Sequence, residues 1–157
     1  KNGSMQISTK CSIAVHCLIF IHEAKGIAKV TSSLLSESTG SNPVVIRNIL
    51  SALKKAGLIT IPRGTGGAEL CKDPSQITLI KYMPPNGVTS LIGIHPCEGR
   101  RCPVAQNIHK VLETPYHRIE DAVKEAMEEI TLQSMIQEFH RLMTEEKASK
   151  PVRAESP

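Results

Sequence analysis

The residues from Ser41 to Leu58, SNPVVIRNILSALKKAGL, specify both ends of one helix and constrain the fold more than any other segment. Ser41 or Asn42 can cap this helix with a side-chain oxygen. Pro43 suits the first helical position, where its missing N–H has no intrahelical partner. Gly57 is the expected C-terminal stop. Apolar residues at helical spacing predict its buried face: Val45, Ile46, Ile49, Leu50 and Leu53.

The segments on either side of this helix predict a helix-turn-helix followed by a wing. Residues 31–38 predict a short helix that is capped by Thr31 or Ser32 and ends in a turn at Gly40. Residues 58–61 predict a strand, and residues 68–71 a returning strand. The glycine-rich stretch between them lacks the P-loop pattern, so a nucleotide-binding loop is rejected. The expected fold is mainly α with a small β wing, a winged helix-turn-helix.

The rest of the chain predicts mostly helices. Residues 8–24 predict a first helix, whereas residues 76–83 suit a short helix or a strand equally well. The expected C-terminal elements are a helix over 103–113, an interruption or kink at Thr114-Pro115, a continuation over 116–130 and a last helix over 132–143.

The long C-terminal helix predicts a homodimer. Its apolar stripe has little core left to meet within one chain, so we expect it to pack against a second chain. The alternative is that it packs on the head of its own chain. Helix-turn-helix proteins commonly recognise two half-sites with two-fold symmetry, which favours the dimer.

The charge of the chain is concentrated in its N-terminal part. Residues 1–65 hold eight Lys and Arg against two Asp and Glu, a net of +6, and residues 66–157 hold eleven against thirteen, a net of −2. This division suggests a nucleic-acid-binding head joined to an assembly or sensing tail. Aromatic residues make up only 3% of the chain, which argues against a stacking platform for single-stranded nucleic acid. Double-stranded DNA is therefore the expected partner.

No segment of the sequence predicts a membrane span or a secretory signal. The uncharged apolar run from Cys11 to Ile21 is far shorter than the ~20 residues that a span needs. No basic segment and small-residue cleavage site frame it as a signal peptide. The expected location is the cytoplasm, where the five cysteines would be reduced thiols rather than a disulfide framework.

Four stretches of the sequence resemble one bacterial family over roughly residues 5–140. They are STKCSIAVHCLIFI, VTSSLLSESTGSNPVVIRNILSALKKAGLITIPRGTGGAEL, ITL and GIHPCEGRRCPVAQNI. These stretches resemble the Rrf-type winged-helix regulators, which include the iron–sulfur regulator IscR, the nitric-oxide regulator NsrR and the cysteine-metabolism regulator CymR. The likeness is greatest to the YwnA-type members. It implies a homodimeric DNA-binding repressor with a long dimerisation helix.

The second helix of the helix-turn-helix is expected to enter the major groove by its N-terminal end. Arg47 can donate two parallel hydrogen bonds to guanine. Arg63 on the wing suits the minor groove, and the wing glycines permit close backbone approach. The predicted DNA-binding residues are Thr31, Ser32, Ser41, Asn42, Pro43, Val44, Arg47, Asn48, Arg63, Gly64, Thr65, Gly66 and Gly67.

Cys97 and Cys102 form the candidate sensor, a thiol pair separated by four residues. Cys102 precedes Pro103 at a predicted helix N-terminus beside two arginines, and both features stabilise a thiolate. Cys97 is close enough in sequence to resolve a sulfenic acid as a disulfide. These features predict an oxidant or electrophile switch without a metal or cofactor. Three further cysteines are expected to be structural: Cys11, Cys17 and Cys71.

Two alternatives to the thiol switch stay open, and a third is rejected. The resemblance implies an iron–sulfur cluster, whose ligands here would be Cys97, Cys102 and His16, although the third cysteine of the family is missing and Ser12 replaces the carboxylate of some relatives. Regulation by a ligand or partner protein would need no cysteine. A thiol enzyme built on Cys102 with His95 or His109 lacks an oxyanion motif, so no catalytic residue and no enzyme are predicted.

The predicted division of the chain follows from these assignments. It comprises a winged helix-turn-helix DNA-binding domain over 5–83, a sensor loop over 84–102, dimerisation helices over 103–143 and a disordered tail over 144–157.

Overall fold

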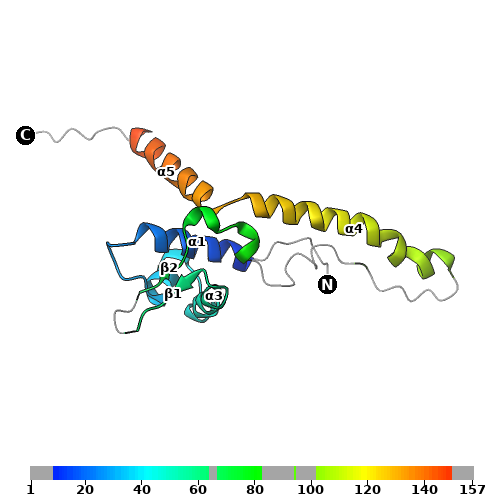
Figure 1. Cartoon of the computed structure of the whole chain (residues 1–157), viewed down its shortest axis with the longest axis horizontal. Helices are drawn as coiled ribbons and strands as arrows, with labels where there is room; N and C mark the ends of the chain where they lie inside the picture. Colours follow the sequence, from blue (N-terminus) through cyan, green and yellow to red (C-terminus); the bar gives the residue numbers. More distant parts are fainter. Residues whose placement is uncertain (1–8, 64–66, 83–93, 95–101, 150–157) are drawn as a thin grey trace, which may run out of the picture.

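The computed structural model describes residues 9–63, 67–82, 94 and 102–149. Helices α1 (Thr9–Glu23), α2 (Ser32–Thr39) and α3 (Pro43–Lys55) pack against one another and form the head of the molecule (Figure 1). Their shared core contains fully buried side chains from each helix: Cys17, Leu18, Leu35 and Ile46. The three helices begin and end close to the expected positions.

Two side-chain caps fix the helix-turn-helix. Thr31 Oγ1 accepts a hydrogen bond from the N–H of Leu34 at 3.2 Å and caps α2. Asn42 Oδ1 accepts one from the N–H of Val44 at 2.8 Å and caps α3. Between the two helices Gly40 has a φ of +65°, a left-handed conformation that glycine adopts without strain. The local sequence thus determines the turn, as expected.

The wing is a two-stranded antiparallel sheet directly after α3. Strand β1 (Ile59–Thr60) pairs with β2 (Glu69–Leu70), with Ile59 opposite Leu70. Ile59 is buried in the core of the head, which anchors the wing to the helices. The winged helix-turn-helix fold is therefore confirmed.

The segment that sequence periodicity left undecided joins the wing to the C-terminal helices. It contains two short 3-10 helices, η1 (Pro74–Gln76) and η2 (Leu79–Tyr82). Between them Thr78 forms an antiparallel bridge with Thr131, and the N–H of Leu132 donates to the carbonyl of Ile77 at 2.7 Å. This pairing spans more than fifty residues of sequence, so local periodicity could not reveal it.

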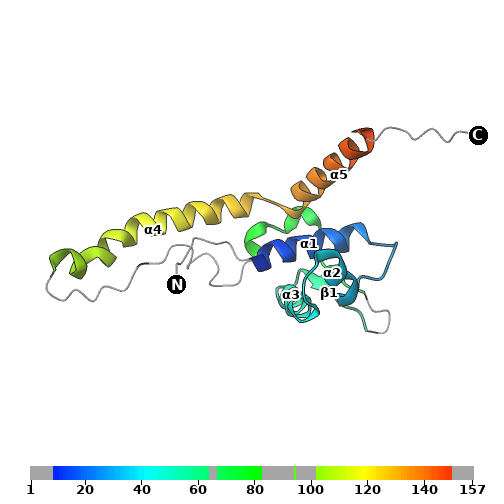
Figure 2. The same cartoon turned by 180° about the vertical axis from the view of Figure 1, so that it is seen from behind.

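Helices α4 (Pro103–Glu129) and α5 (Leu132–Ser149) diverge from this bridge in different directions (Figures 1 and 2). Among the described residues, the C-terminal end of α4 contacts η2, where Met127 packs against Leu79 and Ile80. The remainder of α4 projects away from the head. No helix of the described ranges is long and apolar enough to cross a membrane.

Helix α5 differs from the expectation of a dimerisation helix over 132–143 and a disordered tail from 144. Its first turns belong to the core of its own head, because Leu132 and Ile136 are buried there beside α1. The helix also continues to Ser149, supported by ion pairs of Arg141 with Glu138 and Glu145. The predicted tail is therefore wrong for 144–149, and 150–157 lie outside the described residues.

The expected interruption at Thr114-Pro115 is also absent, since α4 is one helix that contains Pro115. Proline removes one hydrogen bond from a helix, but the helical segments on both sides carry the same apolar stripe and continue through it.

Candidate DNA-binding surface and cysteine sites

Helix α3 has one buried face and one exposed face. Ile46, Ile49, Leu50 and Leu53 point into the core, so the helix is fixed in its rotation about its axis. The opposite face exposes Asn42, Val44, Arg47 and Asn48. Val44 is 57% exposed, a high value for an aliphatic side chain, and thus has no packing role in the head. These four residues were predicted from the sequence to face DNA.

Arg47 is held along the N-terminal half of α3. Its Nε donates to the carbonyl oxygen of Pro43 at 3.3 Å. That long hydrogen bond uses one of the five guanidinium donors, and the two terminal nitrogens have no hydrogen-bond partner within the described part of the chain. The side chain therefore presents its planar fork to an outside acceptor.

A groove of about 400 Å³ runs between the start of α2, the outer face of α3 and the base of the wing. It brings together four predicted residues that are distant in sequence: Thr31, Ser32, Arg47 and Gly67. Ser51 and Lys54 line the same groove and were not predicted. They lie four and seven residues after Arg47, the spacing of one helix face, and this periodicity was the signal that could have identified them.

Several predicted contact residues also hold the head together. The oxygens of Thr31 and Asn42 are the helix caps described above. Ser41 receives a hydrogen bond from Ser36 Oγ to its carbonyl at 2.6 Å, and its own N–H donates to Thr39 Oγ1 at 3.2 Å. These residues therefore fix the turn, and only their remaining polar groups are available to DNA.

The wing is described only in part. Arg63 is exposed at its edge, while Gly64, Thr65 and Gly66 lie outside the described residues. Gly67 packs so closely on the segment before α2 that an added Cβ would lie 3.2 Å from the backbone nitrogen of Val30. Next to it, the N–H of Ala68 donates to the carbonyl of Val30 at 2.9 Å. The base of the wing is thus attached to the start of α2.

The cysteines fall into two groups by exposure. Cys11 and Cys17 are buried in α1, and burial raises the pKa of both thiols, that of Cys17 to about 11. Their structural role is confirmed. Cys71, also expected to be structural, has an exposed side chain after β2, so packing does not explain it. Cys102 is exposed at the N-terminus of α4, and Cys97 lies outside the described residues.

Two of the ligands considered for an iron–sulfur cluster, His16 and Cys102, lie far apart within one chain. His16 lies on α1, where its Nε2 and Ser38 Oγ are 2.9 Å apart. Cys102 lies at the N-terminus of α4, and this end of the helix is far from the head (Figure 1). No group of three potential metal ligands occurs among the residues the structure describes. The described donor set therefore does not fit a cluster in a single chain.

The head, its exposed α3 face and the attached wing define a winged helix-turn-helix regulator of transcription. Residues 7–138 match the Rrf2 family, described as an iron-dependent transcriptional regulator, and the chain belongs to this family. Membership in a family of transcriptional regulators also agrees with the prediction that the chain is not an enzyme.

Known proteins resemble the chain over most of its length. The HTH-type transcriptional regulator YwnA of Bacillus subtilis (strain 168) is 29% identical over 131 residues, which cover 83% of this chain and 96% of YwnA. A transcriptional regulator from Lactobacillus plantarum has a crystal structure with a TM-score of 0.66 and 25% identity, covering 90% of this chain and 98% of that chain. T. potens IscR shares the fold, with a TM-score of 0.61 and 21% identity over 85% of this chain and 87% of that chain.

Proposed function

We propose that the chain is a homodimeric, sequence-specific repressor that binds a double-stranded DNA operator in the cytoplasm. The observation that carries this proposal is the exposed polar face of α3, which is continuous with the groove at the wing base. The buried face of α3 fixes the rotation of the helix about its axis. The exposed face is therefore already oriented for the major groove of a duplex.

In the proposed complex the N-terminal half of α3 lies in the major groove. Arg47 donates its unpartnered terminal nitrogens to guanine, while Val44 and Asn48 contact neighbouring base edges. Thr31, Ser32 and Lys54 are positioned along the groove for backbone phosphates, which hold the register of the protein on the duplex. Arg63 and the glycine-rich wing approach the minor groove, with Gly64, Thr65 and Gly66 as the predicted contacts there.

Selection of bound duplexes from a random DNA library tests sequence-specific binding. We expect enrichment of one motif that contains two half-sites related by two-fold symmetry. A transcriptional reporter placed under the enriched sequence is expected to be silenced by the chain. Failure to enrich any motif would contradict the proposal, whereas activation of the reporter would contradict repression alone.

The proposed dimer is carried by α4. This helix has 27 residues and is therefore roughly 40 Å long, most of it away from the head. Large apolar side chains are exposed along it: Val104 at 68%, Val111 at 63% and Ile119 at 44%. An apolar stripe at helical spacing on a projecting helix is typical of packing against another helix. A second copy of α4 is the occupant that we propose.

The proposed regulatory thiol is Cys102. Its side chain is exposed and makes no capping hydrogen bond at the start of α4. Its exposure leaves the sulfur accessible to oxidants in the surrounding solution. Hydrogen peroxide is expected to release the wild-type protein from the enriched DNA but to have a smaller effect on Cys102→Ser. Equal sensitivity of the two proteins would contradict a role for Cys102.

An iron–sulfur cluster is the second candidate for sensing, and the family description favours it. Because His16 and Cys102 are far apart in one chain, a cluster with both ligands would need residues from two chains. Visible absorbance of an anaerobic preparation tests this candidate. A colourless preparation that contains no iron would exclude it and leave the thiol pair, or a ligand or partner protein that needs no cysteine.

A further inference from the structure

A second cavity, of about 640 Å³, lies behind the wing on the other side of the wing base. It is enclosed by the end of α1, the segment that leads into α2, and β2 with the residues after it. Ile21, Ala68 and Leu70 supply apolar lining. The volume lies in the range typical of small-molecule sites. No part of the proposed DNA-binding mechanism uses this cavity.

Three lysines and two carboxylates line the cavity, which gives its lining a formal net charge of +1. Lys25, Lys29 and Lys72 line it. None of these three ammonium groups forms an ion pair within the described part of the chain. Of the two acidic lining residues, Asp73 is engaged elsewhere, because its carboxylate accepts hydrogen bonds from the N–H and the hydroxyl of Ser75 at 2.9 and 2.5 Å. The other is Glu69 of β2.

We propose that this cavity binds a small organic anion that carries two or more carboxylate or phosphate groups. Three lysines that line one concave surface match several negative charges better than one. The apolar lining accommodates a short carbon skeleton between these groups. Carboxylates and phosphates share this chemistry, so the experiment below uses one probe of each kind.

The cavity and the DNA-binding groove share a wall. Val30, Gly67 and Ala68 line both of them. The hydrogen bond from the N–H of Ala68 to the carbonyl of Val30 and the close approach of Gly67 join the two segments of this wall. Lys29 precedes Val30, and Thr31, the cap of α2, follows it. An anion that draws Lys29 into the cavity is therefore expected to shift the position of both the wing base and the cap of α2.

The bound anion is expected to weaken DNA binding. It neutralises lysines of the basic head, and it displaces the wall that positions the groove. This regulatory part rests on the proposed DNA-binding function, whereas binding of the anion does not. The two are therefore tested separately.

Cys71 supplies a reporter inside the cavity, because its exposed thiol is part of the lining. Tryptic cleavage after Arg63 and Lys72 releases it in a peptide that contains no other cysteine. Mass spectrometry of that peptide measures the alkylation rate of Cys71 by neutral iodoacetamide, at constant ionic strength, with citrate or pyrophosphate as the probe. At ten times the Kd of the probe, we expect alkylation of Cys71 to slow about tenfold and that of Cys102 to stay unchanged.

A charge-matched pair of triple variants distinguishes the cavity from general charge effects. The cavity variant is Lys25→Gln, Lys29→Gln and Lys72→Gln, and the control variant is Lys110→Gln, Lys124→Gln and Lys147→Gln on α4 and α5. Protection of Cys71 should be saturable, be lost in the cavity variant and persist in the control variant. No protection by either probe, or equal protection in both variants, would overturn the proposed site.

Gel-shift titration on the selected duplex then tests the coupling. The protecting probe is expected to weaken DNA binding of the wild type and of the control variant by about fivefold or more, but not that of the cavity variant. Protection of Cys71 without a change in DNA affinity would overturn the regulatory part. If the cavity variant without probe loses DNA affinity far beyond the control variant, the lysines contact DNA phosphates instead, which would overturn the anion site.

Discussion

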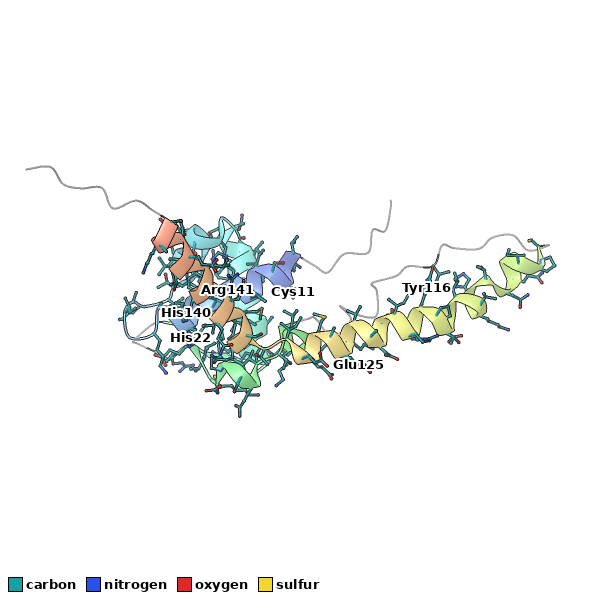
Figure 3. All side chains as sticks on the ribbon, turned by 90° about the horizontal axis from the view of Figure 1, so that it is seen from above. Cys11, His22, Tyr116, Glu125, His140 and Arg141 are labelled. Atoms are coloured by element: carbon teal, nitrogen blue, oxygen red, sulfur yellow. The ribbon has the colours of Figure 1, made fainter. Side chains whose placement is uncertain are left out.

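Glu23 at the end of α1 and His140 of α5 are in direct contact although 117 positions separate them, with Glu23 Oε1 and His140 Nε2 2.8 Å apart. The same carboxylate oxygen lies 3.1 Å from His22 Nδ1. Figure 3 shows His22 and His140 on the same side of the head, where α5 crosses α1. The first turns of α5 are buried in the head, and this contact attaches a later, exposed turn of α5 to α1 as well.

This contact predicts a dependence of stability on pH. Burial raises the pKa of Glu23, but hydrogen bonds from His22 and His140 and the attraction of both imidazoles outweigh it and hold the pKa below its ordinary value of 4.5. A carboxyl group with a lowered pKa stabilises the fold above its unfolded pKa, and this contribution is lost as the pH falls through the folded pKa.

The change from Glu23 to Gln should therefore lower Tm near neutral pH and lower it less at a pH well below 4.5, because the wild-type carboxyl becomes protonated as the pH falls through its folded pKa. Thermal unfolding at both pH values measures the difference. Glu125→Gln, at an exposed position near the C-terminal end of α4 (Figure 3), is the control and should change Tm little at either pH. A deficit of Glu23→Gln that is equal at both pH values would show that its charge is not involved.

Because only the first turns of α5 are buried in the head, substitutions along this helix should lower the free energy of unfolding by unequal amounts. Ile136 is 1% exposed in the core, so Ile136→Ala should lower the free energy of unfolding by about 2–5 kcal/mol. Met143 is 39% exposed two turns later, so Met143→Ala should cost about 1 kcal/mol or less. Urea denaturation of both variants measures the two losses. Equal losses would contradict the placement of α5.

The proposed α4 interface predicts that a charge on its apolar stripe dissociates the dimer. Val111→Glu places a carboxylate among exposed apolar side chains, whereas His109→Glu places the same group on another face of the helix. Light scattering coupled to size-exclusion chromatography measures the molar mass, which is expected to be that of a dimer for the wild type and for His109→Glu. It should give a monomer for Val111→Glu. A wild-type monomer, or a Val111→Glu dimer, would refute the interface.

Exposure predicts the order in which the described cysteines react. Cys71 and Cys102 should be alkylated in the native protein, while Cys11 and Cys17 should react only after denaturant is added, because both are buried and have raised pKa values. Peptide-resolved mass spectrometry after iodoacetamide treatment measures each rate. Rapid native alkylation of Cys17 would mean that α1 does not pack as described.

Local sequence signals predicted the head well. The caps at Thr31 and Asn42 and the stop at Gly57 depend on a few neighbouring residues, and the structure contains all three. The outward face of α3 follows from apolar spacing alone, so the sequence suffices to predict the candidates for DNA contact on this helix.

The contacts that the sequence did not predict are those between distant segments. The bridge between Thr78 and Thr131 and the burial of Ile136 beside α1 join parts of the chain that share no local pattern. Ser51 and Lys54 join the groove only because the wing base packs beside α3. The cavity behind the wing is likewise lined by three separate segments of the chain, so no single sequence motif predicts it.

The most direct test of DNA recognition by α3 compares Arg47→Ala with Lys147→Ala, a removal of one positive charge from α5, on the selected duplex and on a duplex with a substituted half-site. We expect Arg47→Ala to weaken binding by about tenfold or more and to lose much of the discrimination between the two duplexes, since a bidentate contact to guanine contributes ~1–3 kcal/mol. Lys147→Ala should match the wild type. Unchanged affinity and unchanged discrimination in Arg47→Ala would contradict the docking of α3 in the major groove.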